Sequence, residues 1–266
     1  MESFSGKVVW ITGASSGIGE ALVYAFAKLG SKVVLTARRE QELRRVQQQA
    51  ELTEKDSLIL PLDLYHTEHI ATSVEQIKQK FGTIDILVCN AGVVQRFAVK
   101  DSSIEVDRQI MELNFFAVTA ITKSVLPIML ENKSGHIVVI SSVMGKLALP
   151  NRSMYAASKH ALHGFFDALR AEVFRDNIGV TVVCPGYVRT NISLNALNAN
   201  GGQYGKMDKG QEDGMPPEKC ANGIISAIKR NKDEVFIGGK EIMVILLKRF
   251  FPGLLNYITK RKKFPI

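Results

Sequence analysis

The chain has 266 residues, of which 46% are hydrophobic and 23% are charged, a composition that excludes a disordered chain and predicts one α/β domain. Its net charge of +8 lies mostly in residues 229–266, which carry ten Lys or Arg against three Asp or Glu. The rest of the chain lacks the basic stripe of a nucleic-acid-binding protein. Cys89, Cys184 and Cys220 lack zinc-ligand spacing and no signal-peptide pattern is visible, so we expect a cytoplasmic protein, not secreted, without disulfides or a metal.

The first predicted strand, residues 7–13, leads into the glycine-rich loop "TGASSGIG" and a helix predicted over 19–30. Gly13, Gly17 and Gly19 suit a tight turn in which helix N–H groups face a pyrophosphate. Their spacing, Gly-x-x-x-Gly-x-Gly, differs from the Gly-x-Gly-x-x-Gly of the standard dinucleotide fingerprint. We predict a dinucleotide site here that also uses Ser15, Ser16 and Ile18; the alternative is a glycine-rich turn without a ligand.

The second predicted strand, residues 31–37, ends in "TARRE". A protein that prefers NAD(H) places an acidic residue here on the ribose hydroxyl, whereas this chain has Ala37 followed by Arg38 and Arg39. Because guanidinium groups bind phosphate well, the pattern predicts NADP(H) in preference to NAD(H). The alternative is a pair of solvated arginines at the start of the helix predicted over 40–53.

The remaining elements continue the alternation of strand and helix. A helix is predicted over 69–82, and further strands are predicted over 57–64, 84–90, 135–142, 179–186 and 233–239. Such alternation predicts a Rossmann-type, doubly wound parallel sheet of about seven strands in a single domain over residues 1–240. The long irregular stretch 195–217 is predicted to be a lid over the substrate.

Tyr155 and Lys159 are four residues apart in a small-residue helix, so their side chains are expected on one face. A tyrosine with an ordinary pKa near 10 is a poor proton donor and acceptor at neutral pH. The nearby ammonium is expected to lower the pKa of Tyr155 toward the working range.

Several short motifs follow the glycine loop in a fixed order: "CNAG" at 89–92, Asn114, "ISS" at 140–142, "YAASK" at 155–159 and "PGYVRT" at 185–190. Together they make residues 5–240 resemble the classical short-chain dehydrogenase/reductase family. The resemblance implies an NAD(P)(H)-dependent oxidoreductase that acts on a carbonyl or alcohol and assembles as a homodimer or homotetramer.

The resemblance also implies roles for four residues. Tyr155 would be the general acid/base, and Lys159 would bind the nicotinamide ribose. Ser142, which the spacing favours over Ser141, would hold the substrate oxygen, and Asn114 would anchor a water that passes protons to the lysine. The simpler alternatives are a strand-end cap for Ser142 and a polar helix residue for Asn114.

Further positions follow from the same resemblance. Asp63 matches an adenine-contacting acid, although a cap for the next helix is the alternative, and Asn90 is alternatively a turn former. The two histidines of the Tyr155 helix, His160 and His163, lack a metal-ligand pattern and are predicted to be structural. The other expected cofactor contacts are Leu64, Ala91, Gly92, Pro185, Gly186, Val188 and Thr190, and the expected substrate contacts include Met144 and Tyr187.

Residues 241–266 form an apolar and basic extension. Its apolar blocks, 242–247 and 250–258, are each too short to span a bilayer. The segment 242–266 is predicted either to lie on an anionic membrane surface or to pack over the substrate pocket or a subunit neighbour. Such a tail makes the chain similar to the hydroxysteroid-dehydrogenase-type branch, which implies a lipophilic substrate such as a steroid, retinoid or acyl derivative. A non-catalytic NADP-binding sensor or scaffold and a 3-oxoacyl-(acyl carrier) reductase are the alternatives.

Overall fold

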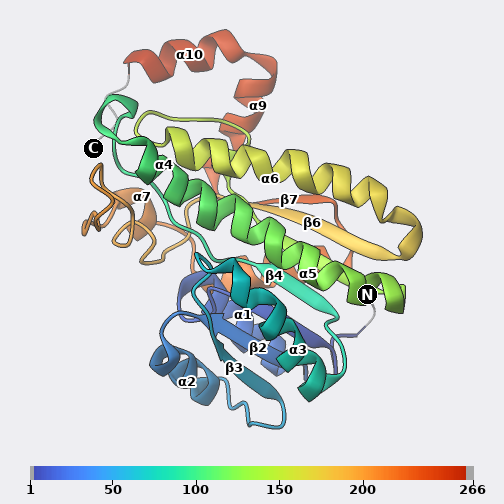
Figure 1. The fold of residues 1–266 in the computed structure, drawn as a ribbon. Coiled ribbons are helices and arrows are strands. Elements are labelled where there is room, and N and C mark those ends of the chain that lie inside the picture. The colour runs from blue at the N-terminus through green and yellow to red at the C-terminus, as the bar shows by residue number, and fades with distance from the viewer. Residues whose placement is uncertain (1–2, 262–266) are drawn as a thin grey trace.

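The computed structural model describes residues 3–261, which form a seven-stranded sheet with helices on both faces (Figure 1). The strand order is β3-β2-β1-β4-β5-β6-β7, and every neighbouring pair is parallel. All seven strands overlap segments predicted from the sequence, so the predicted Rossmann-type fold is confirmed. The strands are β1 Val8–Thr12, β2 Lys32–Ala37, β3 Ser57–Pro61, β4 Ile86–Cys89, β5 Gly135–Ile140, β6 Ile178–Pro185 and β7 Glu234–Ile237.

Alternate residues of each strand face opposite helical layers. In β1, Trp10 packs with helices α3, α5 and α6, whereas Ile11 packs with α1, α2 and α8. This arrangement explains why the strands read as continuous apolar runs, because both faces are buried. The helices are α1 Gly17–Lys28, α2 Glu40–Gln49, α3 Ile70–Phe81, α4 Ile104–Met111, α5 Ala117–Asn132, α6 Ser153–Glu172, α7 Lys209–Glu212, α8 Pro217–Lys229, α9 Met243–Phe250 and α10 Pro252–Arg261.

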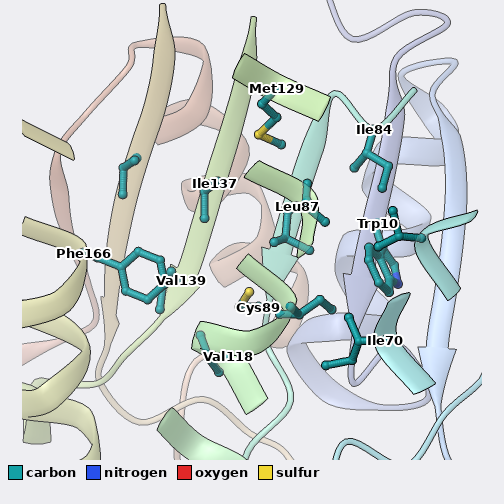
Figure 2. Packing of buried hydrophobic residues seen from close by; sticks show 14 of the residues in the cluster. Trp10, Ile70, Ile84, Leu87, Cys89, Val118, Met129, Ile137, Val139 and Phe166 are labelled. Atoms are coloured by element: carbon teal, nitrogen blue, oxygen red, sulfur yellow. The ribbon is translucent and has the colours of Figure 1, made fainter. Parts of the chain in front are cut away.

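The core beneath α3, α5 and α6 is built around Trp10 and Phe166, both fully buried (Figure 2). The indole Nε1 of Trp10 donates a 2.8 Å hydrogen bond to Thr36 Oγ1, so this large side chain is buried without an unpaired donor. The packing fixes β1, β4 and β5 relative to α6, which carries Tyr155 and Lys159.

The strand order reverses between β1 and β4. From β1 the chain winds outward to β2 and β3, and from β4 it winds the other way to β7. A crevice forms at the carboxyl ends of the strands at such a switch point, and ligands of open α/β sheets bind there. The glycine loop that follows β1 and the "CNAG" segment that ends β4 meet at this point.

Helices α4 and α5 join through a π-helical turn, Glu112–Phe116, into one helix over Ile104–Asn132. By length and composition alone this 29-residue helix is apolar enough to cross a membrane, with a mean hydropathy of 1.6 over its best window. Half of that window is buried, and Ile121 and Val125 pack in the core against the sheet. The apolar character is therefore explained by packing inside the domain.

The predicted lid, residues 195–217, is more ordered than its sequence indicates. It contains α7 and short bridges that pair Leu197 with Gln95 and Met215 with Val188. After β7 the chain forms α9 and α10, and Figure 1 shows α10 standing away from the sheet. Glu241 and Val244, at the start of this extension, line a cavity that Tyr155 and Lys159 also line. Residues 262–266 of the predicted membrane segment lie outside the described part of the chain.

Candidate active site

The glycine loop has the backbone that its sequence predicts. Gly13 and Gly17 have φ of +67° and +59°, in the left-handed region that favours glycine. Gly19 is required for a different reason, because a Cβ there would lie 2.2 Å from the carbonyl oxygen of Gly13. Ser16 precedes α1 without capping it through its side chain, so within the described residues the first N–H groups of this helix face the crevice.

Asn90 ties the two crossing loops together. Its Nδ2 donates to the carbonyl oxygens of Thr12 at 2.9 Å and Gly13 at 3.3 Å. In return, the Thr12 hydroxyl accepts hydrogen bonds from the backbone N–H groups of Asn90 and Ala91. Asn90, for which the alternative role is that of a turn former, therefore holds the glycine loop against the end of β4.

A cavity of about 550 Å³ extends from the glycine loop along the ends of β2 and β3. Arg38 and Arg39 line it with exposed side chains, and neither forms an ion pair with a carboxylate among residues 3–261. Asp63 also lines it, while its Oδ1 accepts a 3.1 Å hydrogen bond from the backbone N–H of Tyr65. Asp63 thus closes a local turn and does not cap a helix. The cavity is also lined by Ser15, Ser16, Ile18, Leu64, Ala91, Gly92 and Thr190.

A second cavity, of about 590 Å³, adjoins the first and holds the predicted catalytic groups. Ile18, Asn90 and Thr190 line both cavities, so a ligand in one reaches the other. The second cavity is lined by Ser142, Tyr155 and Lys159, by the predicted contacts Met144, Pro185, Gly186, Tyr187 and Val188, and by apolar side chains that include Val94, Leu147 and Leu149.

Ser142 and Lys159 approach Tyr155 from different elements. Ser142 follows β5, and its hydroxyl accepts a 3.1 Å hydrogen bond from the backbone N–H of Met144. That hydroxyl thus caps the turn after β5, and its interaction with Tyr155 acts to lower the pKa of the phenol. Lys159 Nζ donates a 2.7 Å hydrogen bond to the carbonyl oxygen of Ile140 and lies 5.8 Å from the centre of the Tyr155 ring.

The protonation of Tyr155 differs from the expectation. Burial raises the pKa of Tyr155 above 10, and the opposing effects of the Ser142 hydrogen bond and of Arg96 and Arg152 are smaller. Burial also lowers the pKa of Lys159 to about 8. The prediction that Lys159 pulls the pKa of Tyr155 down is wrong for this structure, because desolvation of the phenolate dominates.

Asn114 is fully buried in the π-helical turn between α4 and α5. Its Oδ1 accepts a 2.8 Å hydrogen bond from the backbone N–H of Val93, and its Nδ2 donates to the Val93 carbonyl oxygen and to Ser158 Oγ. Turns of this kind inside α-helices are frequent at functional sites. Asn114 therefore links the "CNAG" segment to α6, next to Lys159.

Gln95 is a further residue of the site, and no motif in the sequence points to it. Its side chain is fully buried, and its Oε1 accepts hydrogen bonds from the backbone N–H groups of Met154 at 2.7 Å and Tyr155 at 3.1 Å. Both N–H groups belong to the first turn of α6, where the helix itself offers them no acceptor. Gln95 thus caps the helix that carries Tyr155 from a loop about sixty residues away in the chain, a contact without a local sequence signal.

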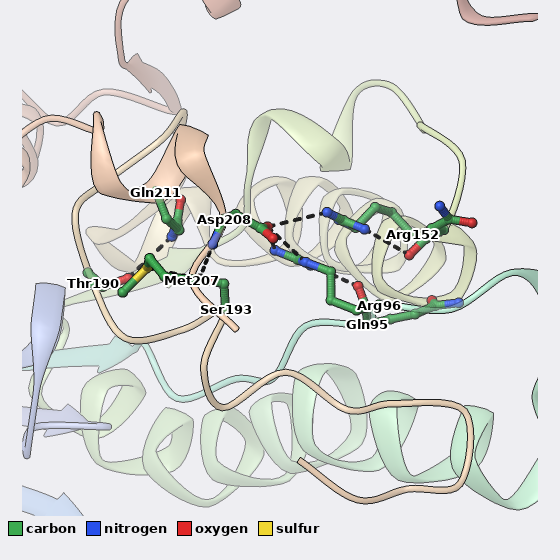
Figure 3. Close-up of polar contacts among 9 residues, drawn as sticks. Gln95, Arg96, Arg152, Thr190, Ser193, Met207, Asp208 and Gln211 are labelled. Carbon is green, nitrogen blue, oxygen red and sulfur yellow. Dashed lines mark hydrogen bonds and ion pairs between the residues drawn. The ribbon is translucent and has the colours of Figure 1, made fainter. Parts of the chain in front are cut away.

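Arg96, Arg152 and Asp208, the last from the segment predicted to be a lid, form a second unpredicted group (Figure 3). Arg96 Nε donates a 2.8 Å hydrogen bond to Asp208 Oδ2, and a further Arg96 nitrogen contacts the same oxygen. Arg152 reaches that oxygen at 3.4 Å. Ser193 holds the lid segment by accepting a hydrogen bond from the Asp208 N–H, and Gln211 donates to Thr190 Oγ1.

His163 has partners that its sequence pattern does not indicate. Its nitrogens lie 3.1 Å from Glu234 Oε1, 3.1 Å from Ser141 Oγ and 3.7 Å from Cys184 Sγ. One ligand atom each from His163, Cys184 and Glu234 lie within 4.8 Å of one another. Only the fold brings these three residues together, so the sequence pattern does not indicate the cluster, and the structural role expected for His163 stays a prediction. Lys146 Nζ lies 2.6 Å from Glu234 Oε1 and already supplies a cation there. His160 hydrogen-bonds the Ala156 carbonyl of its own helix.

The chain is similar to known proteins over almost its whole length. A family model described as short chain dehydrogenase matches residues 7–200. A dehydrogenase/reductase SDR family protein 7-like from Anopheles gambiae is 48% identical over 97% of this chain and 83% of its own length. The fold is shared with a short chain dehydrogenase/reductase from Burkholderia phymatum in complex with NAD, at a TM-score of 0.85, 24% identity and coverage of 100% and 99%. It is also shared with a short chain dehydrogenase from Burkholderia cenocepacia in complex with NADP, at 0.80, 22% identity and coverage of 98% and 100%.

Proposed function

The chain belongs to the short-chain dehydrogenase/reductase family of oxidoreductases, and from that premise we propose that it uses NADP(H) to interconvert a carbonyl and an alcohol on a lipophilic substrate. The observation that carries the proposal is the convergence of Ser142, Tyr155 and Lys159 on the second cavity, which shares Ile18, Asn90 and Thr190 with the first. The glycine loop supports a dinucleotide in the first cavity, because its tight turn has the form of a pyrophosphate-binding loop. Only glycine at position 19 allows this turn, since a Cβ there would collide with the backbone of Gly13. When bound, NADPH supplies a hydride, and NADP⁺ accepts one in the reverse direction.

Tyr155 is the proton donor for reduction. Its hydroxyl gives a proton to the substrate oxygen while the carbonyl carbon receives the hydride, so the C=O bond becomes H–C–OH. Burial raises the pKa of Tyr155 and so makes it a weaker acid, which means that proton transfer depends on stabilisation of the phenolate left behind. Ser142 donates a hydrogen bond to the same oxygen and stabilises the negative charge that develops on it.

Lys159 and Asn114 support Tyr155. Lys159 is positioned to bind the nicotinamide ribose, and its ammonium favours the phenolate that remains after proton transfer. Asn114 orders the segment around Gly92, where a Cβ would lie 3.0 Å from its Oδ1 and 3.6 Å from Lys159 Nζ. This crowding supports a role for Asn114 beside the lysine in returning a proton to Tyr155.

Arg38 supports the preference for NADP(H). No carboxylate occupies the end of β2, because Ala37 stands there, and the Arg38 guanidinium lines the cavity without a carboxylate partner in the described chain. A guanidinium at this position binds a 2′-phosphate, whereas NAD(H) offers only a hydroxyl there. Arg39 also lines the cavity, and a solvated role remains the alternative for it.

The apolar lining of the second cavity supports a lipophilic substrate. Val94, Leu147 and Val244 contribute to this lining from three separate parts of the chain. A cavity of this size encloses a molecule of steroid, retinoid or acyl size. A 3-oxoacyl-(acyl carrier) reductase is the alternative enzyme, and a sensor or scaffold is the alternative without catalysis, although a scaffold has no need for a complete set of catalytic side chains.

We also propose that the protein is cytoplasmic, contacts a membrane surface through residues 242–266, and forms a homodimer or homotetramer. Exposed apolar side chains on α9 and α10 support the membrane contact: Met243, Leu246, Phe250, Phe251, Leu254, Tyr257 and Ile258. Basic residues follow each apolar block, at 248–249 and at 260–263, which suits an anionic lipid surface. Phe116, 51% exposed on the helix over Ile104–Asn132, supports self-association.

The proposed function is tested by NADPH oxidation with a panel of lipophilic ketones, aldehydes and quinones, followed at 340 nm. We expect turnover of at least one compound and less with NADH at equal concentration. Turnover of a carrier-bound acetoacetyl thioester alone would favour the acyl-carrier alternative. NADPH binding without turnover of any compound would favour the sensor.

A further inference from the structure

The second cavity contains an excess of positive charge at its buried end. Arg96 is buried, with a side-chain exposure of 6%, and Arg152 has a side-chain exposure of 20%. Both guanidinium groups share a single oxygen of Asp208. Two cations therefore face one anion in a largely apolar enclosure, and burial together with the charge of Arg96 lowers the pKa of Arg152 to about 10.

Other charged groups around the cavity do not balance this excess. Five basic side chains line it, and the acidic ones are Asp208 and Glu241. Glu241 is already bound by the backbone N–H groups of Tyr187 and Gly239 at 3.2 and 2.9 Å. A buried cation without a full counter-charge is unfavourable, so this end of the cavity suits a further anionic group.

The arginine pair also lies next to the catalytic group. Arg96 and Arg152 both act electrostatically on Tyr155, and Arg152 immediately precedes the helix that carries it. Asp208, in contrast, belongs to the lid, where Figure 3 shows it reaching toward the two guanidinium groups from the opposite side. Its carboxylate thus occupies a position that a ligand carboxylate or phosphate would take.

We propose that Arg96 and Arg152 bind an anionic group of the substrate, a carboxylate or a phosphate, in place of the Asp208 carboxylate. The substrate is then an amphiphile, with its reacting carbonyl at Tyr155, its oxyanion at the arginines and its apolar body against the lining around Leu147. Replacement of the Asp208 carboxylate by the anionic group of the substrate couples substrate binding to release of the lid segment around Asp208. This inference rests on the proposed function for the identity of the ligand as substrate.

The test measures binding without turnover, by calorimetry of the purified full-length protein with octyl phosphate, octanoate and octanol below their micelle concentrations. We expect at least one anionic ligand to bind tenfold or more tightly than octanol, and the tighter of the two names the anion. Arg152→Gln should weaken that binding at least tenfold. The matched control is Arg175→Gln, an exposed arginine before the amino end of β6, whereas the cavity is at the carboxyl end of that strand; this variant should leave the binding unchanged.

Asp208→Asn is the second variant, and it keeps both arginines, so it tests the inference even if the Arg152 variant does not fold. It removes the competing carboxylate, so anion binding should become several-fold tighter. Equal binding of octanol and both anions, or weaker anion binding by Asp208→Asn, overturns the inference. Because no turnover is measured, these results are separate from the proposed function. Anion binding that depends on the arginines supports the anion site even if no ketone is reduced. Ketone reduction without such anion binding supports the proposed oxidoreductase and overturns the anion site.

Discussion

At the scale of single residues, Tyr155 is a buried acid whose pKa is raised by desolvation. A donor of this kind is fully protonated below its raised pKa and loses its proton as pH rises through that value. We therefore expect kcat for ketone reduction to show no loss assignable to Tyr155 between pH 6 and 9 and to fall above about pH 10. The measurement is a pH–rate profile at saturating substrate. A fall in kcat with its midpoint near pH 7, below the pKa of about 8 for Lys159, would show that the tyrosine works with a lowered pKa instead.

Arg38 is the residue to which we assign the proposed preference for NADP(H). Arg38→Ala should weaken NADPH binding by about 10-fold to 100-fold, because a charge-assisted contact to phosphate contributes about 1.5–3 kcal/mol, and should leave NADH binding unchanged. Fluorescence titration of both cofactors measures the ratio. Arg44→Ala is a matched control, since that exposed arginine pairs with Glu40 on α2. An unchanged ratio of the two affinities in Arg38→Ala would remove the basis for the NADP(H) assignment.

At the scale of elements, Gln95 fixes the start of α6. Gln95→Met leaves the N–H groups of Met154 and Tyr155 without their acceptor, so we expect the free energy of unfolding to fall by about 1–3 kcal/mol. We expect kcat to fall with little change in KM, because the residue positions Tyr155 without contacting substrate. Urea unfolding and steady-state kinetics measure both effects.

Two further variants separate capping from general damage to the protein. Gln95→Glu keeps an acceptor oxygen for the same N–H groups and should restore part of kcat. Gln48→Met, on the exposed side of α2, should change neither stability nor kcat. If Gln95→Met lowered stability but left kcat intact, the cap would be structural only.

The elements of the sheet were predictable from the sequence, whereas much of the second cavity was not. The seven strands can be recognised as short apolar runs because both faces of the sheet are buried. Gly13 and Gly17 indicate the position of their loop because their positive φ angles favour glycine. Gln95 and Asp208 carry no such local signal. They act through partners more than fifty residues away, which only the folded chain brings together.

At the scale of the whole molecule, α9 and α10 present an apolar surface that the domain does not cover. We expect the protein to bind vesicles containing 30% phosphatidylserine and to bind pure phosphatidylcholine vesicles more weakly. The double variant Phe250→Ser with Leu254→Ser should reduce binding at least fivefold, because both side chains are exposed and are free to insert into lipid. Co-sedimentation with the vesicles measures the bound fraction.

Phe174→Ser is the control for that experiment, since Phe174 is 79% exposed at the far end of α6. It should bind vesicles like the unmodified protein. If the tail variant bound vesicles normally but changed mass in light scattering, from dimer or tetramer to monomer, the apolar surface would be a subunit contact and the membrane proposal would be wrong.

The central claim, that the chain is an NADPH-dependent carbonyl reductase acting through Tyr155, is tested most directly by a single turnover with NADPH deuterated at the transferred position. We expect the unmodified protein to place one deuterium on the alcohol carbon of the product. Tyr155→Phe should bind NADPH with unchanged affinity and transfer deuterium at least a thousandfold more slowly, a loss of about 4 kcal/mol of transition-state stabilisation. Transfer at an equal rate by the variant, or tight binding of NADPH with no transfer by the unmodified protein, would contradict the account.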